Sequence, residues 1–281
     1  MIGIKKLHDD VPKPMKFQNE DKRPVMGDHI ISACNASIFL VAKRNSGKTT
    51  TLFKLLQSCI DKKNTQVFIF CANLYIDKAY KVIRTWLEKN KVTWFGFTSV
   101  TNDNVNQLKI LSETIKQLAE DEEDDDDDDD EIEPSNVAPS NKINIIDSDD
   151  YRYRKSKKPK HQTPKYIIIF DDMSDQLKGP DLETLLKNGR HFARVIISSQ
   201  YLHDIRPEAR KQIGYWFVYK SNKDKLPIIY RDADLSIPFE MLEMLYDKAV
   251  SEPYNFLYID TREQEFRIGF NRKFIIPSEM M

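Results

Sequence analysis

Short apolar runs alternate with amphipathic segments along most of this chain. The apolar runs consist almost wholly of aliphatic and aromatic residues, which is typical of strands buried on both faces of a parallel sheet. We expect strands at residues 38–41, 67–71, 92–97, 166–172, 195–200 and 215–219. Between them, apolar residues recur at spacings of three and four, which indicates helices. We expect helices at residues 52–60, 77–89, 105–118, 181–187 and 207–212. The alternation predicts an α/β fold with a mostly parallel central sheet and helices on both of its faces.

Two details refine this picture. The helix at 77–89 should have one apolar side, formed by Ala79, Val82, Ile83, Trp86 and Leu87. Near the C-terminus, a helix at 239–250 precedes two apolar runs, 256–260 and 265–270, that a short polar turn connects. Such a pair predicts a hairpin, so the sheet should end in antiparallel edge strands.

The domain organisation follows from where the apolar periodicity stops. Residues 1–35 are polar and contain Pro12, Pro14 and Pro24, so we expect an extended N-terminal arm. Residues 36–281 then form one domain, interrupted by an insertion at about 119–164 that has no apolar periodicity. A segment of this composition buries too little apolar surface to offset its ordering entropy, and we expect most of it to be disordered.

Net charge first argues against a nucleic-acid partner, because 43 basic residues face 44 acidic ones. Thirteen of those acids lie within residues 120–133, so the remainder of the chain has 31 acids and a net charge of +12. A core of that charge can attract DNA phosphates without regard to sequence, although lysine-rich chains are often simply soluble. The basic segment at 151–160, which contains two tyrosines, could bind nucleic acid or a nuclear importer, or be a solvated loop.

Several function classes are disfavoured. The three cysteines are far apart, with neither the spacing of a disulfide framework nor that of a zinc site. The start of the chain has no apolar segment of a secretory signal, and no apolar run is long enough to cross a bilayer. These features favour a soluble intracellular protein.

The segment after the first strand has the pattern of a phosphate-binding loop. Such a loop needs free backbone N–H groups, a following helix, a lysine for the terminal phosphates and a hydroxyl for Mg²⁺. These requirements are met by the run Ala42, Lys43, Arg44, Asn45, Ser46, Gly47, Lys48, Thr49 and Thr50. Lys48 would contact the phosphates and Thr49 would bind the metal. Ala42 stands where the motif has its first glycine, which is harmless at negative φ and strained at positive φ. A chance Gly-Lys-Thr at a helix start is the alternative.

Two acids and an amide follow later strands. Asp171 and Asp172 end the run at 166–172, at the sheet edge where α/β proteins bind ligands. There Asp171 can hold hydrated Mg²⁺ and Asp172 can deprotonate an attacking water; alternatively, both acids cap the next helix. Gln200 ends the next strand and could sense a γ-phosphate or position water, or be an ordinary polar residue at a strand end. Arg190 could stabilise a transferring phosphoryl group from a neighbouring subunit, with Arg206 and Arg210 as rivals, or lie in a surface turn.

The order AKRNSGKTT, YIIIFDDMSD and NGRHFARVIISSQ resembles the genome-packaging ATPases of nucleocytoplasmic large DNA viruses and virophages. These form the poxvirus-like packaging branch of the FtsK/HerA superfamily, and the resemblance spans roughly residues 36–220. It implies a RecA-like ASCE P-loop fold, a ring-shaped homo-oligomer, and ATP- and Mg²⁺-dependent translocation of double-stranded DNA into a capsid. A capsid or portal partner and a location in the virion or viral factory follow from the same resemblance.

The resemblance also implies roles for individual residues. Lys48 and Thr49 match the Walker A residues, Asp171 and Asp172 the Walker B pair, Gln200 the polar sensor and Arg190 an arginine finger. Two departures from the family pattern are Ala42 and Asp172, since many relatives have Gly and Glu there. The alternatives are a non-motor P-loop protein such as a nucleotide kinase, and a structural virion protein with a relict nucleotide site.

Overall fold

The computed structural model describes residues 21–102, 105–124 and 160–277. Their main feature is a nine-stranded sheet in the order β11-β10-β9-β8-β1-β7-β6-β2-β3. The six strands from β8 to β3 run parallel, and β9, β10 and β11 add antiparallel neighbours at one edge. The strands are β1 (Ala36–Val41), β2 (Gln66–Cys71), β3 (Thr93–Phe97), β6 (Tyr166–Asp171), β7 (Ala193–Ser199), β8 (Tyr215–Tyr219), β9 (Phe256–Asp260), β10 (Glu265–Ile268) and β11 (Arg272–Lys273). A separate two-stranded ribbon pairs β4 (Thr101–Asn102) with β5 (Val105–Asn106).

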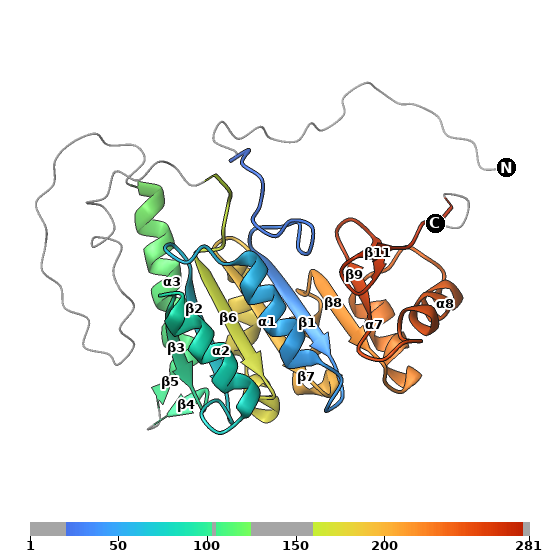
Figure 1. The fold of residues 1–281 in the computed structure, drawn as a ribbon, viewed down its shortest axis with the longest axis horizontal. Coiled ribbons are helices and arrows are strands. Elements are labelled where there is room, and N and C mark those ends of the chain that lie inside the picture. The colour runs from blue at the N-terminus through green and yellow to red at the C-terminus, as the bar shows by residue number, and fades with distance from the viewer. Residues whose placement is uncertain (1–20, 103–104, 125–159, 278–281) are drawn as a thin grey trace, which may run out of the picture.

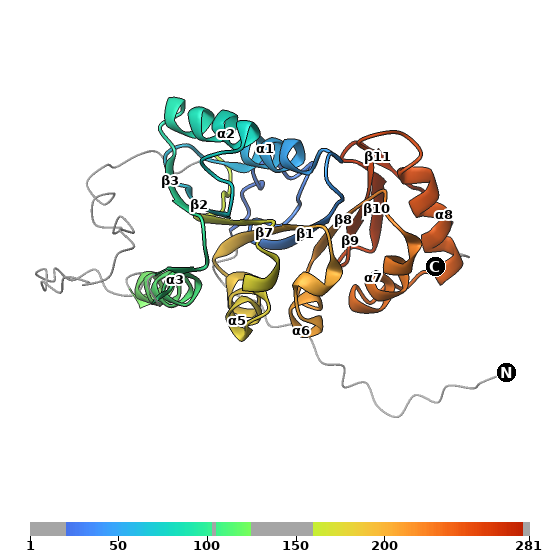
Figure 2. The same cartoon turned by 90° about the horizontal axis from the view of Figure 1, so that it is seen from below.

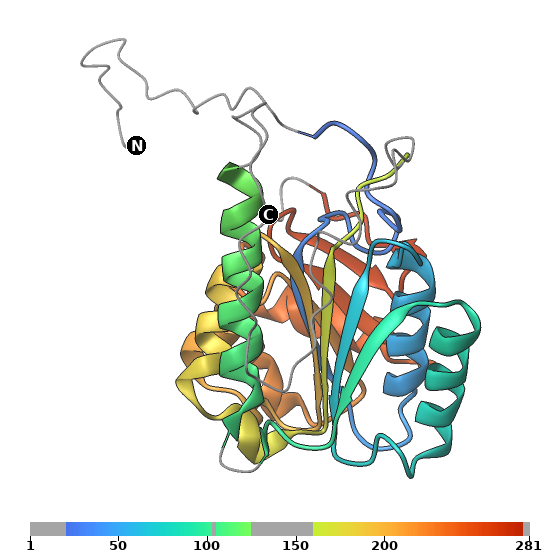
Figure 3. The ribbon, with the colours of Figure 1, turned by 90° about the vertical axis from the view of Figure 1, so that its left-hand side faces the viewer.

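Helices cover both faces of this sheet (Figure 1). Figure 2 shows α1 and α2 on one face and α3, α5 and α6 on the other, with α7 and α8 beside the C-terminal strands. The same layering is visible in Figure 3, where the green helix α3 lies across the sheet from the blue and teal helices α1 and α2. The helices are α1 (Lys48–Cys59), α2 (Lys78–Lys89), α3 (Gln107–Asp124), α5 (Pro180–Gly189), α6 (Pro207–Arg210), α7 (Leu226–Asp232) and α8 (Phe239–Ala249).

The core consists of two apolar clusters, one on each face of the sheet. Because side chains alternate along a strand, β1 sends Ile38 and Leu40 into the cluster under α1 and Phe39 and Val41 into the other. Every residue of β1, β2, β6, β7 and β8 is buried. This two-sided burial explains why the sequence has continuous apolar runs there rather than alternating ones.

The expected N-terminal arm and insertion are described only in part. Residues 21–35 pack against the domain: Ile30 and Ile31 are buried beneath α1, and Arg194 donates hydrogen bonds to the carbonyl oxygens of Ala33 (2.6 Å) and Cys34 (2.8 and 3.1 Å). Helix α3 extends to residue 124, into the expected insertion. Residues 1–20 and 125–159, on which most of the disorder prediction falls, lie outside the described residues.

The structure corrects the prediction for the face of α2. Its buried residues are Tyr80, Ile83 and Leu87, whereas Val82 is 57% exposed. Trp86 packs edge-on against Phe53 of α1 instead of facing the sheet. The helix therefore packs in two directions, against the sheet and against α1. The prediction of one apolar side does not describe this arrangement.

Element ends also shift slightly. Helix α3 begins at Gln107 rather than 105, because Val105 and Asn106 pair with β4. Strand β10 ends at Ile268, and Gly269 turns with φ of 57°. Helix α7 is a helix that the periodicity did not predict.

Candidate nucleotide-binding site

The carboxyl ends of four parallel strands lie level at one edge of the sheet, towards which the arrowheads of β1 and β6 point in Figure 1. The register pairs Val41 of β1 with Ser199 of β7, Ser198 of β7 with Asp171 of β6, and Asp171 with Cys71 of β2. Strand β7 lies between β1 and β6. This order brings the loop after β1, the acids after β6 and Gln200 after β7 to one place.

The loop between β1 and α1 presents a run of free backbone donors. Ala42 N–H donates to the Ser199 carbonyl oxygen (3.0 Å), and Thr51 N–H donates to the Gly47 carbonyl oxygen (3.0 Å). Among the described residues, no backbone N–H group from residue 43 to residue 50 donates a hydrogen bond. The first N–H groups of a helix have no partner inside it, and their positive end attracts anions. The loop can therefore bind phosphate groups with its backbone.

Backbone conformation settles the question raised by Ala42. Ala42 is fully buried and is not among the residues with positive φ, so alanine causes no strain at this position. The left-handed conformations lie further along the loop, at Asn45 (φ 61°) and Gly47 (φ 93°). The glycine of the motif is thus needed at Gly47 and can be replaced at Ala42.

Lys48 joins the loop to the acidic pair. Its buried ammonium group lies 3.4 Å from Asp171 Oδ1 and forms a second ion pair with Asp172 Oδ2. The Asp172 side chain is much more exposed than that of Asp171 (41% against 5%). Three of the predicted site residues are therefore in direct contact, with the lysine between the loop and both carboxylates.

Asp171 is a buried carboxylate with few partners. Tyr80 Oη donates a hydrogen bond to its Oδ2 (2.7 Å), while Oδ1 accepts none from any described residue. Burial raises the pKa of Asp171 above its ordinary value, and the charge of Lys48 and the hydrogen bond from Tyr80 only partly offset that shift. Burial, together with the charge of Asp171, also raises the pKa of Cys71 to about 12. Burial thus disfavours the charged form of Asp171, and a bound cation would stabilise that form.

Asp172 has a strained backbone. Its φ is 51°, and its N–H donates to the Ser198 carbonyl oxygen (3.0 Å). Aspartate is one of the few side chains that tolerate this left-handed region, where it still costs free energy. The turn carries the carboxylate out of the β6 line and towards Lys48.

Gln200 is fixed through its backbone. Lys225 Nζ donates to the Gln200 carbonyl oxygen (2.6 Å) and lies 5.8 Å from the centre of the Tyr201 ring. Burial lowers the pKa of Lys225 below its ordinary value, and the positive charge of Lys43 acts in the same direction. Sequence reasoning missed Lys225, as it missed Tyr80, since neither belongs to a strand end.

The three arginines have different settings. Arg190 caps the C-terminus of α5, is exposed, and precedes the amino end of β7, so it lies at the sheet edge opposite the other site residues. Arg206 is exposed before α6, with Arg206 Nε 3.8 Å from Glu208 Oε2. Arg210 is buried, paired with Asp232 (2.6 Å), and donates to the carbonyl oxygens of Leu202 and Ile205. Its hydrogen bonds hold α6 in place, so Arg210 is no longer a rival for the finger role.

The donor set fits Mg²⁺ better than a protein-caged metal. No group of three His, Cys, Asp or Glu side chains gathers as a metal centre among residues 21–102, 105–124 and 160–277. Mg²⁺ is usually held by one or two protein oxygens, with substrate phosphates and waters completing the shell. Two groups match that requirement: Asp171 Oδ1, which accepts no hydrogen bond from a described residue and lies 3.4 Å from the Lys48 ammonium, and the hydroxyl of Thr49.

The comparisons with known proteins agree with this geometry. The family model described as "Poxvirus A32 protein" matches residues 134–260, just under half of the chain. The chain is similar to this family. The poxvirus-like resemblance predicted from the sequence is thereby confirmed.

One solved structure and two curated relatives extend this result. The genome packaging NTPase B204 from Sulfolobus turreted icosahedral virus 2, in complex with AMP, matches with a TM-score of 0.50 and 17% identity, over 83% of this chain and 96% of that one. This confirms the predicted α/β fold. "Uncharacterized protein 075L" of Invertebrate iridescent virus 6 is 29% identical over 109 residues, and "Uncharacterized protein 015R" of Frog virus 3 (isolate Goorha) is 26% identical over 126 residues. The matches cover 37% and 41% of this chain, and the chain spans about two fifths of these curated relatives (42% and 38%).

In the described part of the chain, no helix is both long and apolar enough to span a membrane.

Proposed function

We propose that this protein is an ATPase that moves double-stranded DNA into a viral capsid. The observation that carries the proposal is the contact of Lys48 with Asp171 and Asp172 beside the free N–H groups of residues 43–50. This is the arrangement a P-loop enzyme uses to hold a triphosphate and cleave its last bond. Similarity to the poxvirus family and to a packaging NTPase supports DNA packaging as the purpose of that chemistry.

Each residue has a role in the proposed hydrolysis. The N–H groups of the loop and Lys48 bind the β- and γ-phosphates, and Thr49 and Asp171 would hold Mg²⁺. When bound, Mg²⁺ would neutralise charge on the phosphate oxygens. Asp172 accepts a proton from water while the water oxygen bonds to the γ-phosphorus; the bond to the β–γ bridging oxygen breaks, releasing ADP and phosphate. Gln200 positions that water.

The ion pair between Lys48 and Asp172 gives this scheme an order of events. A carboxylate paired with an ammonium group is a poor base, because the pair stabilises its charged form. The triphosphate offers Lys48 a stronger anionic partner than Asp172. Binding of ATP therefore draws Lys48 away and frees Asp172 to accept a proton only when substrate is present.

The DNA partner and the assembly follow from charge and from position. The net charge of +12 outside residues 120–133 suits sequence-independent binding of a duplex. Arg190 lies at the sheet edge away from its own site, so a finger role for it requires the site of a neighbouring subunit. We therefore propose a ring-shaped homo-oligomer that works with a capsid or portal component, in the virion or in a viral factory of the host cell.

ATP turnover of the purified protein with and without duplex DNA tests the proposal. We expect turnover that duplex DNA increases, and we expect Lys48→Ala to abolish it. Lys54→Ala, an exposed lysine on the same helix, is the matched control and should hydrolyse ATP normally. Turnover without DNA stimulation would favour a non-motor P-loop enzyme. No turnover, with Lys48→Ala indistinguishable from wild type, would leave a structural protein with a relict site.

The finger assignment has its own test. Arg190→Ala should bind ATP but lose hydrolysis, because the cation it supplies acts during phosphoryl transfer. Mixing Arg190→Ala with Asp172→Asn subunits should restore part of the activity, since some interfaces then combine an intact site with an intact arginine. If Arg190→Ala hydrolyses ATP normally, the role passes to Arg206.

The acidic residues 120–133 suggest a regulator of DNA binding. A tethered polyanion beside a basic core competes with DNA for the positive surface, and salt weakens that competition. Deleting residues 120–133 should tighten duplex binding at low ionic strength and have less effect at high ionic strength. Unchanged affinity at low salt would contradict this role.

A further inference from the structure

The loop between α8 and β9 lies directly against the phosphate-binding loop. A β-carbon added to Gly47 would lie 3.4 Å from Tyr254 Cδ1, so the Tyr254 ring is next to Gly47 and occupies the space that a side chain there would enter. Between them opens a cavity of about 250 Å³, whose lining includes Asn45, Ser46, Tyr219, Tyr254 and Asn255. Asn45 and Ser46 of the phosphate-binding loop line one part of this cavity, and Tyr254 lines another.

Tyr254 has an exposure and a backbone conformation that are unusual for a large aromatic residue. Its side chain is 73% exposed, and its φ of 66° lies in the left-handed region, which bulky residues rarely occupy. The loop is held from both sides: Asn255 Nδ2 donates to Glu252 Oε2 (2.9 Å), and Arg272 pairs with that oxygen (3.2 Å). An exposed ring on a fixed, strained backbone is a surface available for stacking.

The order of the strands indicates which part of a nucleotide reaches this cavity. The acids that act on the γ-phosphate end β6, which lies on one side of β1 with β7 between them. A triphosphate held by the loop after β1 must direct its γ-phosphate to that side. The ribose and base must then leave on the other side of β1, where β8 and β9 lie. Tyr219 ends β8 and Tyr254 precedes β9, so the cavity is on this side.

We propose that this cavity is the nucleobase subsite and that the ring of Tyr254 stacks on the base. The inference rests on the proposed ATPase function and names the part of the substrate that the phosphate-binding loop does not hold. Aromatic stacking is largely insensitive to which base is bound, so the subsite adds affinity for nucleotides as a class. Tyr254 is then a substrate-binding residue that lies more than 200 positions from the motif it serves.

The test separates the base from the phosphates by using two probes, ATP and inorganic tripolyphosphate, in calorimetric titrations of the full chain. Tyr254→Ala should weaken ATP binding about tenfold, because base stacking on an aromatic residue is typically lost to that extent on substitution. Binding of tripolyphosphate should not change, and Tyr254→Phe should bind ATP like wild type. Tyr75→Ala is the matched control, since Tyr75 is 56% exposed and follows β2 on the far side of the site.

A second variant guards against loss of the fold. Tyr254→Asn removes the ring but introduces a residue that tolerates positive φ, so the loop keeps its conformation. It should show the same loss of ATP affinity as Tyr254→Ala. ATP binding by Tyr254→Asn equal to that of wild type overturns the inference, as does an equal loss of ATP and tripolyphosphate binding. If wild type binds neither probe, the proposed function itself fails.

Discussion

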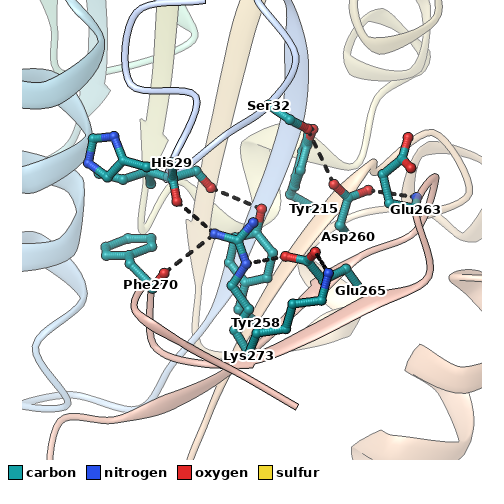
Figure 4. A network of polar contacts seen from close by, with 11 residues as sticks. His29, Ser32, Tyr215, Tyr258, Asp260, Glu263, Glu265, Phe270 and Lys273 are labelled. Carbon is teal, nitrogen blue, oxygen red and sulfur yellow. Dashed lines mark hydrogen bonds and ion pairs between the residues drawn. The ribbon is translucent and has the colours of Figure 1, made fainter. Parts of the chain in front are cut away.

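Two polar regions of this molecule differ in how completely their groups are paired. Around β9 and β10, polar side chains bind one another and the N-terminal segment (Figure 4). Arg267 forms an ion pair with Glu265, donates to the His29 carbonyl oxygen (2.7 Å), and lies 4.6 Å from the centre of the Tyr258 ring. Tyr258 Oη donates to the Ile30 carbonyl oxygen (2.9 Å). At the carboxyl ends of β1 and β6, by contrast, the described residues leave the N–H groups of residues 43–50 and Asp171 Oδ1 without hydrogen bonds, although the Lys48 ammonium lies 3.4 Å from that oxygen.

The two buried aspartates show the difference most directly. Burial raises the pKa of both Asp260 and Asp171. Asp260 accepts hydrogen bonds from the N–H groups of Arg262 (3.0 Å) and Glu263 (3.1 Å), whereas Asp171 accepts its one hydrogen bond from Tyr80. A raised pKa alone therefore does not distinguish a structural carboxylate from a functional one. Buried polar groups normally accept hydrogen bonds, so Asp171 Oδ1, which accepts none from a described residue and has the Lys48 ammonium 3.4 Å away, marks the place for a ligand.

The largest expected effect concerns these two aspartates. Asp171→Asn should lower kcat for ATP hydrolysis by about 10²–10³-fold, as is typical when one charge-stabilising group of an active site is removed. Asp260→Asn is the matched control, because it neutralises a buried aspartate that only the network uses. Steady-state turnover of both variants measures the contrast. An equal loss of turnover in Asp260→Asn would contradict the division into a functional and a structural region.

The next effect is on stability and concerns the network. Arg267→Met keeps the apolar stem but removes the ion pair with Glu265 and the bond to the His29 carbonyl oxygen. We expect the free energy of unfolding to fall by about 1–3 kcal/mol, since the largely buried Glu265 carboxylate loses one of its two partners and keeps only Lys273. Urea unfolding measures this loss, with ATP turnover per folded molecule unchanged. Arg262→Met, at an 84% exposed side chain, should leave the unfolding midpoint where it is. A large fall in turnover of Arg267→Met would show that the network also serves the site.

Much of this comparison could be predicted from the sequence, for a physical reason. The predicted site residues lie at or just after the ends of strands buried on both faces, and such strands are continuous apolar runs in the sequence. Asp171 ends β6, Asp172 and Gln200 follow β6 and β7, and Lys48 follows the loop after β1. Parallel strands bring their carboxyl ends to one edge, so the runs alone place these side chains together.

The residues that were missed come from elements that no strand end positions. Tyr80 lies on α2, which packs against both the sheet and α1. The apolar positions of this helix therefore do not reveal in the sequence which side faces the sheet. Lys225 precedes α7, a seven-residue helix too short for a period to be recognised. Tyr254 lies in the loop between α8 and β9, which brings its ring next to Gly47. Their positions depend on packing between helices and loops, which periodicity does not encode.

A smaller effect tests whether Lys225 belongs to the site region. Lys225→Met removes the hydrogen bond to the Gln200 carbonyl oxygen, and we expect kcat to fall about three- to tenfold with little change in KM. That size corresponds to the net contribution of one hydrogen bond, roughly 0.5–1.5 kcal/mol. Lys223→Met is the control and should keep wild-type kcat, because Lys223 shares the three-residue 3₁₀ helix Lys223–Lys225 with Lys225 but is paired with Asp247. A rise in KM without a change in kcat would show that Lys225 does not position Gln200.

The smallest effect is the pH dependence of stability at Asp171. Its pKa is higher in the folded protein than in the unfolded chain, so between these two values the folded state binds more protons. Stability then falls as pH rises through that window, because unfolding releases protons. Asp171→Asn lacks this titration, and its Tm should exceed that of the wild type at pH 8 by a few degrees, since about 1 kcal/mol shifts the Tm of a domain of this size by ~2–4 °C.

The difference in Tm between the two proteins should shrink as the pH falls through the folded-state pKa of Asp171, because the wild-type carboxyl then takes up its proton. Groups common to both proteins, including Asp260, cancel in this difference. Thermal unfolding of nucleotide-free samples across the pH range measures it. A difference that grows towards acid pH would mean that Lys48 and Tyr80 stabilise the Asp171 carboxylate by more than burial destabilises it. In that case the Asp171 carboxylate would already be stabilised without a ligand, and the contrast with the network around Arg267 would disappear.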